Sequence, residues 1–305
     1  MRIGIASHIV LDTIQGSDGT TSESIGGPAC YCGLTARRFG FQVSLATRVG
    51  RDFLPVGRKM LRDNDLLLNE KKQVVDASTT RFSLISEGDS RRLVLQAICD
   101  PLTPDDIREM DVDCWLASPV FNEVPLDVLD AIKENRGNRD FVMLDPQGYV
   151  RQTVGGNNGP VTLLERIDLD LTGITAIKVD PWEMSALTSG LQGVEGMRAL
   201  LSRGVKFVVL TEYRIIHLFY EKMHYWIKLR DVDTPDSTGA GDILSAAFCC
   251  AYLKEKDPLW AICFGAGAVR AALETKQVGL SKIPSKSKIE ESASYFYNTV
   301  GFKIS

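Results

Sequence analysis

The sequence is poor in the residues and patterns that build metal sites, disulfide frameworks and nucleic-acid surfaces. Its 305 residues include only three histidines, at scattered positions, and its seven cysteines form no Cys-x-x-Cys pair. We therefore expect small buried thiols in a reducing compartment instead of zinc or disulfide bridges. There is no block of five consecutive basic residues and the formal net charge is −4, which argues against nucleic acid as a partner.

Long apolar stretches are also missing. The longest uncharged runs near the C-terminus, such as 258–269, are shorter than the ~20 residues that cross a bilayer. Residues 1–8 lack the apolar length and the cleavage site of a signal peptide. We therefore expect a protein that stays in the cytoplasm and has no membrane partner.

Two common glycine motifs are absent as well. No Gly-x-x-x-x-Gly-Lys-Ser/Thr sequence occurs, which excludes a Walker-type nucleotide loop, and no Gly-x-Gly-x-x-Gly follows the first strand. The second absence removes the main sequence support for a dinucleotide-dependent oxidoreductase.

What the sequence does contain is a regular alternation of strand and helix patterns, with 44% hydrophobic and 24% charged residues. Apolar runs rich in Val and Ile alternate with segments of helical period. The pattern predicts an α/β fold: a doubly wound, mainly parallel sheet flanked by helices, in a single domain over residues 1–305. We expect strands at 3–6, 43–48, 114–118, 141–145, 175–179, 206–211, 215–220 and 224–229, and helices at 28–39, 53–64, 125–135, 181–188, 194–202, 240–253 and 259–273.

Segments 9–25 and 73–99 depart from this alternation. Both contain alternating polar and apolar residues, and residues 87–90 have the composition of a turn between two strands. We expect these segments to form a small antiparallel β lid. Its strand edges and the apolar side chains of Phe82, Leu84 and residues 93–95 would need cover, so we expect a homodimer through the lid.

The most informative segment is 233–242, Asp-Thr-Pro-Asp-Ser-Thr-Gly-Ala-Gly-Asp, which runs directly into a helical pattern. Glycine at a helix start leaves backbone N–H groups accessible and the helix dipole adds positive potential, so the segment predicts an anion pocket. A carboxylate beside a phosphate is repelled by it, which makes sense if Asp242 accepts a proton from an attacking hydroxyl. The alternative is an ordinary first-turn acid with glycines that serve a tight turn.

These residues resemble the ribokinase-like (PfkB) family of carbohydrate and nucleoside kinases. The family signature Asp-Thr/Ser-Thr-Gly-Ala-Gly-Asp stands at 236–242, and a double glycine that opens a helix stands at Gly26 and Gly27, followed by a family-like run at 45–53. The similarity spans essentially the whole chain. It implies a kinase that uses ATP with Mg²⁺ to phosphorylate a hydroxyl of a sugar, an inositol-like polyol or a nucleoside. In it, Asp242 is the catalytic base and the amides of Gly239, Ala240 and Gly241 form the anion hole.

The resemblance also assigns an acceptor site. Gly26 and Gly27 let the substrate approach the backbone, and Asp12, expected at the end of the first strand, accepts hydrogen bonds from its hydroxyls unless it is a turn residue. Tyr31 replaces a family asparagine, which implies a reshaped and more apolar pocket. Arg151, in the run Asp-Pro-Gln-Gly-Tyr-Val-Arg after a strand, is placed to bind substrate or phosphate; the alternative is a surface arginine.

The resemblance also implies a site for the phosphate donor and its ions. Asp180 and Glu183 stand where the family orders Mg²⁺ and its waters, and they also have the spacing of a capping box. Thr211 ends a strand that lacks the usual glycines, and it contacts phosphate or ribose or caps a turn. Asp236, with Thr238, is implied as a ligand of a monovalent cation such as K⁺, with a cap or turn role as the alternative.

Two functions of different classes are consistent with these residues. The first is the ATP-dependent kinase, in which the lid closes over a small substrate before in-line transfer. The second is a non-catalytic sensor of the same fold that binds a sugar or nucleotide. The intact Gly-Ala-Gly-Asp run at 239–242 favours the kinase, because a sensor has no use for the base.

Overall fold

The larger of the two main sheets forms the body of the molecule, and the predicted catalytic residues lie at one of its edges. The computed structural model describes residues 1–15, 21–87, 90–154, 156, 158–232, 234 and 236–304. Within them this sheet has nine strands in the order β17-β16-β15-β14-β13-β10-β9-β1-β4. The strands are β1 (Arg2–Ala6), β4 (Gln42–Ala46), β9 (Cys114–Ala117), β10 (Val142–Leu144), β13 (Ala176–Val179), β14 (Phe207–Glu212), β15 (Ile215–Tyr220), β16 (Met223–Lys228) and β17 (Gly301–Ile304).

The strands from β4 to β14 in this order run parallel, and β15, β16 and β17 continue the sheet as an antiparallel extension. The central parallel strands β1, β9, β10 and β13 are buried along nearly their whole length, as the unbroken apolar runs predict. Since the carboxyl ends of parallel strands share one edge, residues that follow β9, β10, β13 and β14 lie close together there.

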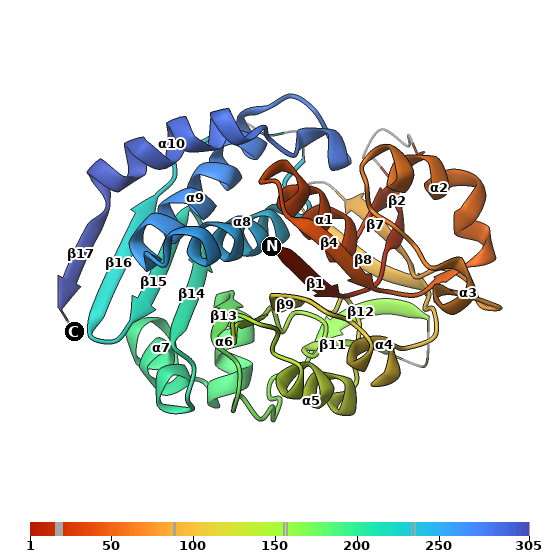
Figure 1. Cartoon of the computed structure of the whole chain (residues 1–305), viewed down its shortest axis with the longest axis horizontal. Coiled ribbons are helices and arrows are strands. Elements are labelled where there is room, and N and C mark those ends of the chain that lie inside the picture. Colours follow the sequence, from red (N-terminus) through yellow and green to blue (C-terminus); the bar gives the residue numbers. More distant parts are fainter. Residues whose placement is uncertain are drawn as a thin grey trace.

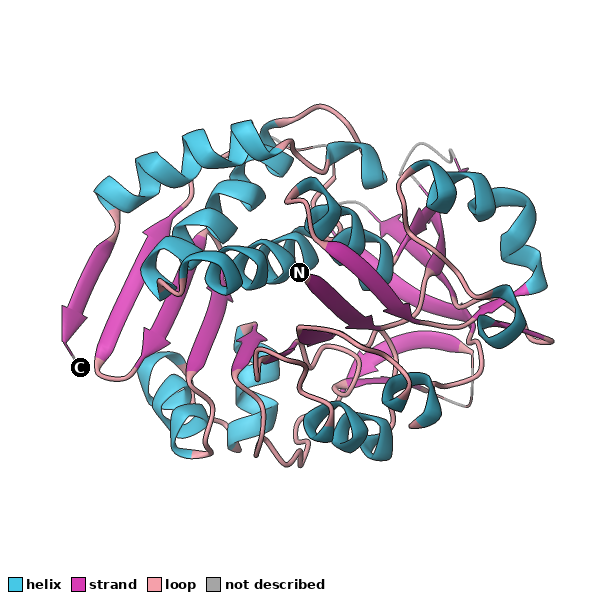
Figure 2. Ribbon diagram, viewed as in Figure 1, coloured by secondary structure: helices cyan, strands magenta, loops and turns pink. Residues whose placement is uncertain are grey.

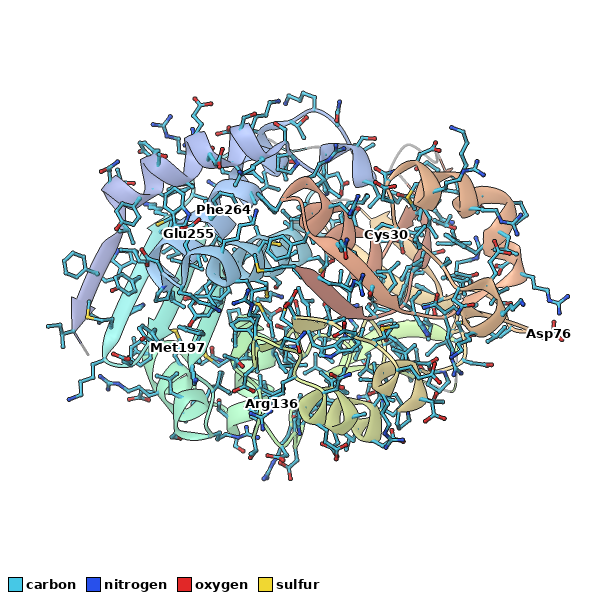
Figure 3. The ribbon with its side chains drawn as sticks, in the orientation of Figure 1. Cys30, Asp76, Arg136, Met197, Glu255 and Phe264 are labelled. Carbon is cyan, nitrogen blue, oxygen red and sulfur yellow. The ribbon has the colours of Figure 1, made fainter. Side chains whose placement is uncertain are left out.

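Helices cover both faces of this sheet (Figures 1 and 2). On one face lie α1 (Pro28–Arg38), α8 (Ala240–Glu255) and α9 (Pro258–Glu274), with α10 (Lys286–Thr299) packed on α9. On the other lie α4 (Asp105–Arg108), α5 (Leu126–Glu134), α6 (Pro181–Thr188) and α7 (Gly193–Ser202). Phe264 of α9 and Met197 of α7 belong to two separate apolar clusters, one on each side of the sheet (Figure 3).

The predicted doubly wound, mainly parallel sheet flanked by helices is therefore confirmed. The predicted helix at 181–188 and the predicted strand at 215–220 match α6 and β15, and the other expected helices and strands overlap observed ones with end shifts of one or two residues. Neither α10 nor β17 was predicted, because segment 286–304 mixes charged, aromatic and small residues without a clear apolar stripe.

The lid is a second sheet, with six strands in the order β11-β12-β8-β7-β2-β3 within the described residues. Its strands are β2 (Val10–Gln15), β3 (Thr21–Gly26), β7 (Arg81–Glu87), β8 (Ser90–Ala97), β11 (Arg151–Thr153) and β12 (Gly159–Leu163). The smaller elements are β5 (Val49–Gly50), β6 (Val74–Val75), η1 (Arg51–Phe53), α2 (Leu54–Asp63), α3 (Glu70–Gln73) and η2 (Gly279–Lys282).

The predicted antiparallel β lid is confirmed as a second, mainly antiparallel sheet, which differs from the prediction in two details. The lid is not wholly antiparallel, because β2 pairs with β7 in parallel; the long connection between them, which contains α1 and β4, supplies the crossover that parallel pairing requires. The lid also includes β11 and β12 from outside the predicted segments. Two residues of the expected 87–90 turn, 88 and 89, lie outside the described residues.

Two of the apolar lid side chains that we expected to need cover are already buried within the chain, while Leu84, Leu93 and Val94 are half-buried. Phe82 and Leu95 are buried and pack with Val10 and Val120 of the same chain. Burial within the chain removes these two side chains as a reason for dimerisation, and the lid dimer stays a prediction.

Two further expectations concern the cysteines and the apolar length of the helices. All seven cysteines are unpaired and buried, as expected for small apolar thiols. Among the residues that the structure describes, no helix combines the length and apolar content needed to cross a bilayer.

Candidate active site

Asp242 lies in the first turn of α8, and the glycine before that helix fixes the loop that leads to it. Gly239 has φ 74°, a left-handed conformation that favours glycine. A Cβ atom on Gly239 would lie 2.5 Å from the ring of Tyr31. Any larger residue at 239 would therefore displace either the loop or Tyr31.

The double glycine before α1 serves a similar purpose. Gly27 has φ 81°, and a Cβ atom there would lie 2.7 Å from the carbonyl oxygen of His8. Gly26 ends β3, where a Cβ atom would lie 3.0 Å from Oδ2 of Asp12. Both glycines thus bring the start of α1 against β2 of the lid.

The three amides expected to form the anion hole are not equivalent. The Ala240 N–H donates to the carbonyl oxygen of Ser237 at 3.2 Å, which closes a turn. The N–H of Gly241 belongs to the first helical turn, where helix geometry supplies no regular carbonyl partner. The Ala240 N–H is thus engaged by the preceding turn. The N–H groups of Gly239 and Gly241 remain as candidate donors to an anion.

Asp242 is 8% exposed, and its carboxylate faces the hydroxyl of Ser118, whose Oγ donates to Oδ1 at 3.5 Å. Burial, reinforced by the charge of Asp145, raises the pKa of Asp242 to about 7, while Lys178 and Arg151 act in the opposite direction. A carboxylate with a pKa near neutrality can both accept and release a proton under physiological conditions.

A buried lysine faces the same loop. The Nζ atom of Lys178, in β13, lies 3.1 Å from Oδ2 of Asp145 and 3.7 Å from Oε2 of Glu183. A Cβ atom on Gly241 would lie 3.3 Å from this Nζ. Burial alone would lower the pKa of Lys178, but Asp145 and Glu183 outweigh it and raise the pKa. A permanent positive charge therefore lies beside the loop that begins α8.

Asp180 and Glu183 form the capping box that their spacing predicts. The Glu183 N–H donates to Oδ1 of Asp180 at 2.8 Å, and the Asp180 N–H donates to Oε2 of Glu183 at 2.7 Å. Burial raises the pKa of Glu183 to about 7, with Lys178 acting against it. No cluster of three or more His, Cys, Asp or Glu that could hold a metal ion occurs in the described ranges.

A cavity of about 240 Å³ lies between the lid and the start of α8. Its walls come mainly from β2, α1, β7, β11 and the 238–242 segment at the start of α8, and they combine acidic, basic, amide and apolar side chains. The lining residues are Val10, Asp12, Gly27, Pro28, Tyr31, Phe82, Leu84, Val120, Gln147, Arg151, Thr238, Gly239 and Asp242.

Asp12 lies in this cavity, within the predicted lid segment 9–25 and not at the end of the first strand. It is in β2 of the lid, because the first strand ends at Ala6 and the chain turns into the second sheet before reaching residue 12. Its side chain is largely buried, and burial raises its pKa to about 7, while Arg151 opposes the shift.

Arg151 begins β11 and is held over the cavity. Its Nη1 donates to the carbonyl oxygen of Val120 at 3.0 Å, and its Nη2 donates to Oε1 of Gln147 at 3.1 Å. The Gln147 amide donates in turn to Oγ of Ser118 at 3.4 Å. Polar contacts thus run from Arg151 to Ser118 and from there to Asp242. Arg151 is half-buried on the cavity wall, and its contact with substrate or phosphate stays a prediction.

The remaining predicted residues lie outside the cavity or serve its walls. Thr211 lies near the end of β14, the strand next to the β13 strand of Lys178, and is not among the cavity-lining residues. The N–H of Thr238 donates to Oδ1 of Asp236 at 2.8 Å. The other oxygen of Asp236 pairs with Lys282, whose Nζ lies 2.9 Å from Oδ2.

Sequence reasoning gave no role to Ser118, Asp145, Lys178 or Lys282. The available signal was weak: Lys178 interrupts the apolar run at 175–179, and Ser118 and Asp145 are the last residues of the predicted strands 114–118 and 141–145. The pairing of Lys282 with Asp236 joins positions 46 residues apart along the chain.

No family model matches the chain. The cytidine kinase of Thermococcus kodakarensis is 23% identical over 255 residues, which cover 81% of this chain and 87% of that protein.

Three solved structures illustrate the structural similarity. A pyrophosphate-dependent kinase in the ribokinase family, complexed with a pyrophosphate analog and myo-inositol, superposes with a TM-score of 0.77 at 22% identity over 95% of this chain and 99% of that one. Fructokinase from Vibrio cholerae O395, bound to fructose and ADP, gives 0.73 at 15% identity over 96% and 98%. Ribokinase from Thermotoga maritima gives 0.70 at 18% identity over 96% and 99%.

Proposed function

We propose that this chain, whose fold is that of the ribokinase-like (PfkB) kinases, transfers a terminal phosphoryl group to a hydroxyl of a small polyhydroxylated substrate. The observation that carries the proposal is the position of Asp242: a buried carboxylate with a pKa near 7 on the wall of a cavity, at the start of α8 and close to a buried lysine.

Asp242 acts as the base in this proposal. It accepts the proton of the acceptor hydroxyl while that oxygen forms a bond to phosphorus and the bridging bond of the donor breaks. The N–H groups of Gly239 and Gly241, together with the Lys178 ammonium, stabilise the charge on the transferring group. A non-catalytic sensor would need neither the base nor this buried cation.

The shape of the cavity favours a compact acceptor with several hydroxyl groups. Its volume of about 240 Å³ suits one sugar-sized ring. Asp12 and Arg151 supply an acceptor and a donor of hydrogen bonds, while Phe82 and Leu84 cover it from the lid. The substrates named for similar proteins, myo-inositol, fructose and cytidine, belong to this class.

Mg²⁺ fits the donor side as a companion of the phosphates. Asp145 and Glu183 offer the hard oxygens that Mg²⁺ prefers, yet they contact Lys178 and form no complete cage. We therefore infer that Mg²⁺ is bound mainly by the donor phosphates, with these carboxylates contacting its waters, and that it neutralises phosphate charge when present.

ATP is the donor that we propose, and pyrophosphate is the second candidate. The strand end that would line the nucleotide reads Thr-Glu-Tyr-Arg at 211–214, without glycine, and Tyr213 is fully exposed. One structurally similar protein is a pyrophosphate-dependent kinase, and pyrophosphate would need only the anion loop and the lysine beside it.

The direct test is a matrix of donors and acceptors. Purified protein with Mg²⁺ is incubated with ATP, GTP, CTP or pyrophosphate and with ribose, fructose, myo-inositol or cytidine, and the phosphorylated product is detected by mass spectrometry. We expect one acceptor to be phosphorylated, and the phosphorylation to be lost in Asp242→Asn but kept in Asp130→Asn, an exposed acid on α5. Ligand-induced thermal shifts without product in any combination would favour the sensor.

A further inference from the structure

Lys282, the last residue of η2, is an unusual lysine because its side chain is completely buried. Its Nζ atom lies 2.9 Å from Oδ2 of Asp236 and donates to the main-chain oxygen of the same residue at 3.1 Å. The ring of Tyr31 lies beneath it, with 5.6 Å between Nζ and the ring centroid. The ammonium group is thus held by a carboxylate, a carbonyl and an aromatic face.

Asp236 is fully engaged in this arrangement. Its Oδ1 accepts the N–H of Thr238 at 2.8 Å and its Oδ2 accepts the N–H of Gly279 at 2.8 Å. The residue therefore connects the 236–239 loop to the 279–282 segment. Burial would raise the pKa of Asp236, but the bonds from Lys282, Gly279 and Thr238 outweigh it and lower the pKa.

These contacts do not fit the monovalent cation that the resemblance implies for this position. A K⁺ ion at Asp236 would use the carboxylate and carbonyl oxygens that Lys282 already contacts. It would also stand next to a positive charge in a buried environment, where repulsion is strong. An ammonium carries the same charge as K⁺ and satisfies the same oxygens.

We propose that the Lys282 ammonium replaces an exchangeable monovalent cation, so that the protein needs no K⁺ to hold its anion loop in place. Lys282 is a positioning residue: it contacts Asp236 at the start of the loop and Tyr31, whose ring packs against Gly239. Through these two residues it fixes the position of the Gly239 N–H and the cavity wall. The role in turnover rests on the proposed kinase function, whereas the cation replacement does not.

The first test uses the wild-type protein and needs no substrate. Melting temperature is measured in KCl and in choline chloride at equal ionic strength, and direct binding of Tl⁺, a probe for K⁺ sites, is followed by ²⁰⁵Tl NMR. We expect the same melting temperature in both salts and no saturable Tl⁺ binding. A K⁺-dependent rise in melting temperature, or saturable Tl⁺ binding that K⁺ displaces, would overturn the proposal.

The second test removes the ammonium. Lys282→Ser leaves space and a hydroxyl oxygen beside Asp236, so in choline chloride we expect the melting temperature to fall by about 5 °C or more, since a buried ion pair loses one partner. K⁺ should restore part of this loss. Lys286→Ser, at an exposed lysine of α10, should show neither effect. An unchanged melting temperature in Lys282→Ser would contradict the proposal.

Turnover gives a third and separate measurement. With the acceptor and donor found in the matrix assay, wild-type turnover should be equal in KCl and choline chloride, and that of Lys282→Ser should fall by about tenfold or more and recover partly with K⁺. Lys282→Met, which keeps the length of the side chain, serves if the serine variant does not fold, and K⁺ should not rescue it. Wild-type turnover that requires K⁺ would refute the role of Lys282, while absence of turnover in every combination would refute the kinase function alone.

Discussion

The Nζ atom of Lys178 lies 3.1 Å from Oδ2 of Asp145, and both side chains are almost completely buried. They come from neighbouring places at the carboxyl edge of the sheet, Lys178 within β13 and Asp145 directly after β10. The pair places one positive charge beside Gly241 and one negative charge near Asp242. The positive charge of Lys178 would attract a phosphate beside Gly241, whereas the negative charge of Asp145 raises the pKa of Asp242.

Replacing Lys178 with methionine should slow phosphoryl transfer more than it weakens substrate binding. A lost donor to the transferring group typically costs about 2.7–4 kcal/mol of transition-state stabilisation, or ~10²–10³-fold in turnover. The KM of the acceptor should change by less than about threefold. Lys133→Met is the matched control, because its side chain is 11% exposed against 10% for Lys178 and lies on α5. Equal effects of the two variants would show that Lys178 has a structural role only.

Substitution of Gly239 by alanine should abolish most activity through Tyr31. Gly239 and Gly40 share a φ of 74°, but a Cβ atom at Gly40 meets nothing within 4 Å, whereas at Gly239 it meets the Tyr31 ring at 2.5 Å. Both variants should lose roughly 1–2 kcal/mol of unfolding free energy from backbone strain. Only Gly239→Ala should lower turnover, by about tenfold or more. Steady-state kinetics and urea unfolding of the two proteins test this, and full activity of Gly239→Ala would contradict the packing.

The raised pKa of Asp242 predicts opposite pH effects on activity and stability. The base must be ionised, so kcat/KM should increase with pH and level off above about 7. Because the folded pKa lies above the unfolded value, the stability that Asp242 contributes is present below about pH 4 and is lost as the pH rises through about 7.

Asp242→Asn should therefore melt at a higher temperature than wild type at pH 8, by about 2–4 °C, and show little difference at pH 4.5. Scanning calorimetry at the two pH values measures this. A variant that is less stable than wild type at pH 8 would show that the ionised carboxylate is well solvated in the folded protein. The same variant of the exposed Asp130 should show no such pH dependence.

Arg151→Met should act mainly on the acceptor. The guanidinium lines the cavity and is fixed by Val120 and Gln147, so its loss removes a charge-assisted hydrogen bond to substrate. We expect the acceptor KM to rise by about tenfold or more, with a smaller fall in kcat. Initial rates over a range of acceptor concentrations measure this, and an unchanged KM would exclude Arg151 from the acceptor site.

Local signals in the sequence predicted most of the large sheet. Pro28 and Pro181 each stand at the first helical position, as predicted, and the glycines around Asp242 correctly indicated a helix start. These features depend on neighbours a few residues away, so a single sequence contains them.

The missing parts depend on contacts between distant segments. Lys178 and Lys282 are ordinary lysines in the sequence, and only the fold brings their ammonium groups to Asp145 and Asp236. The parallel pairing of β2 with β7 likewise depends on how the chain returns through the large sheet. The placement of Asp12 at the end of the first strand was wrong for the same reason, because the chain changes sheets after Ala6 and residue 12 belongs to the predicted lid segment 9–25.

The most direct test of Asp242 as the base separates binding from chemistry. Acceptor affinity is measured by calorimetry and phosphoryl transfer by single-turnover quench, in wild type and in Asp242→Asn at pH 7.5. We predict affinities within about threefold and a transfer rate reduced by ~10² or more. Transfer at the wild-type rate in Asp242→Asn would contradict the assignment of this residue as the base.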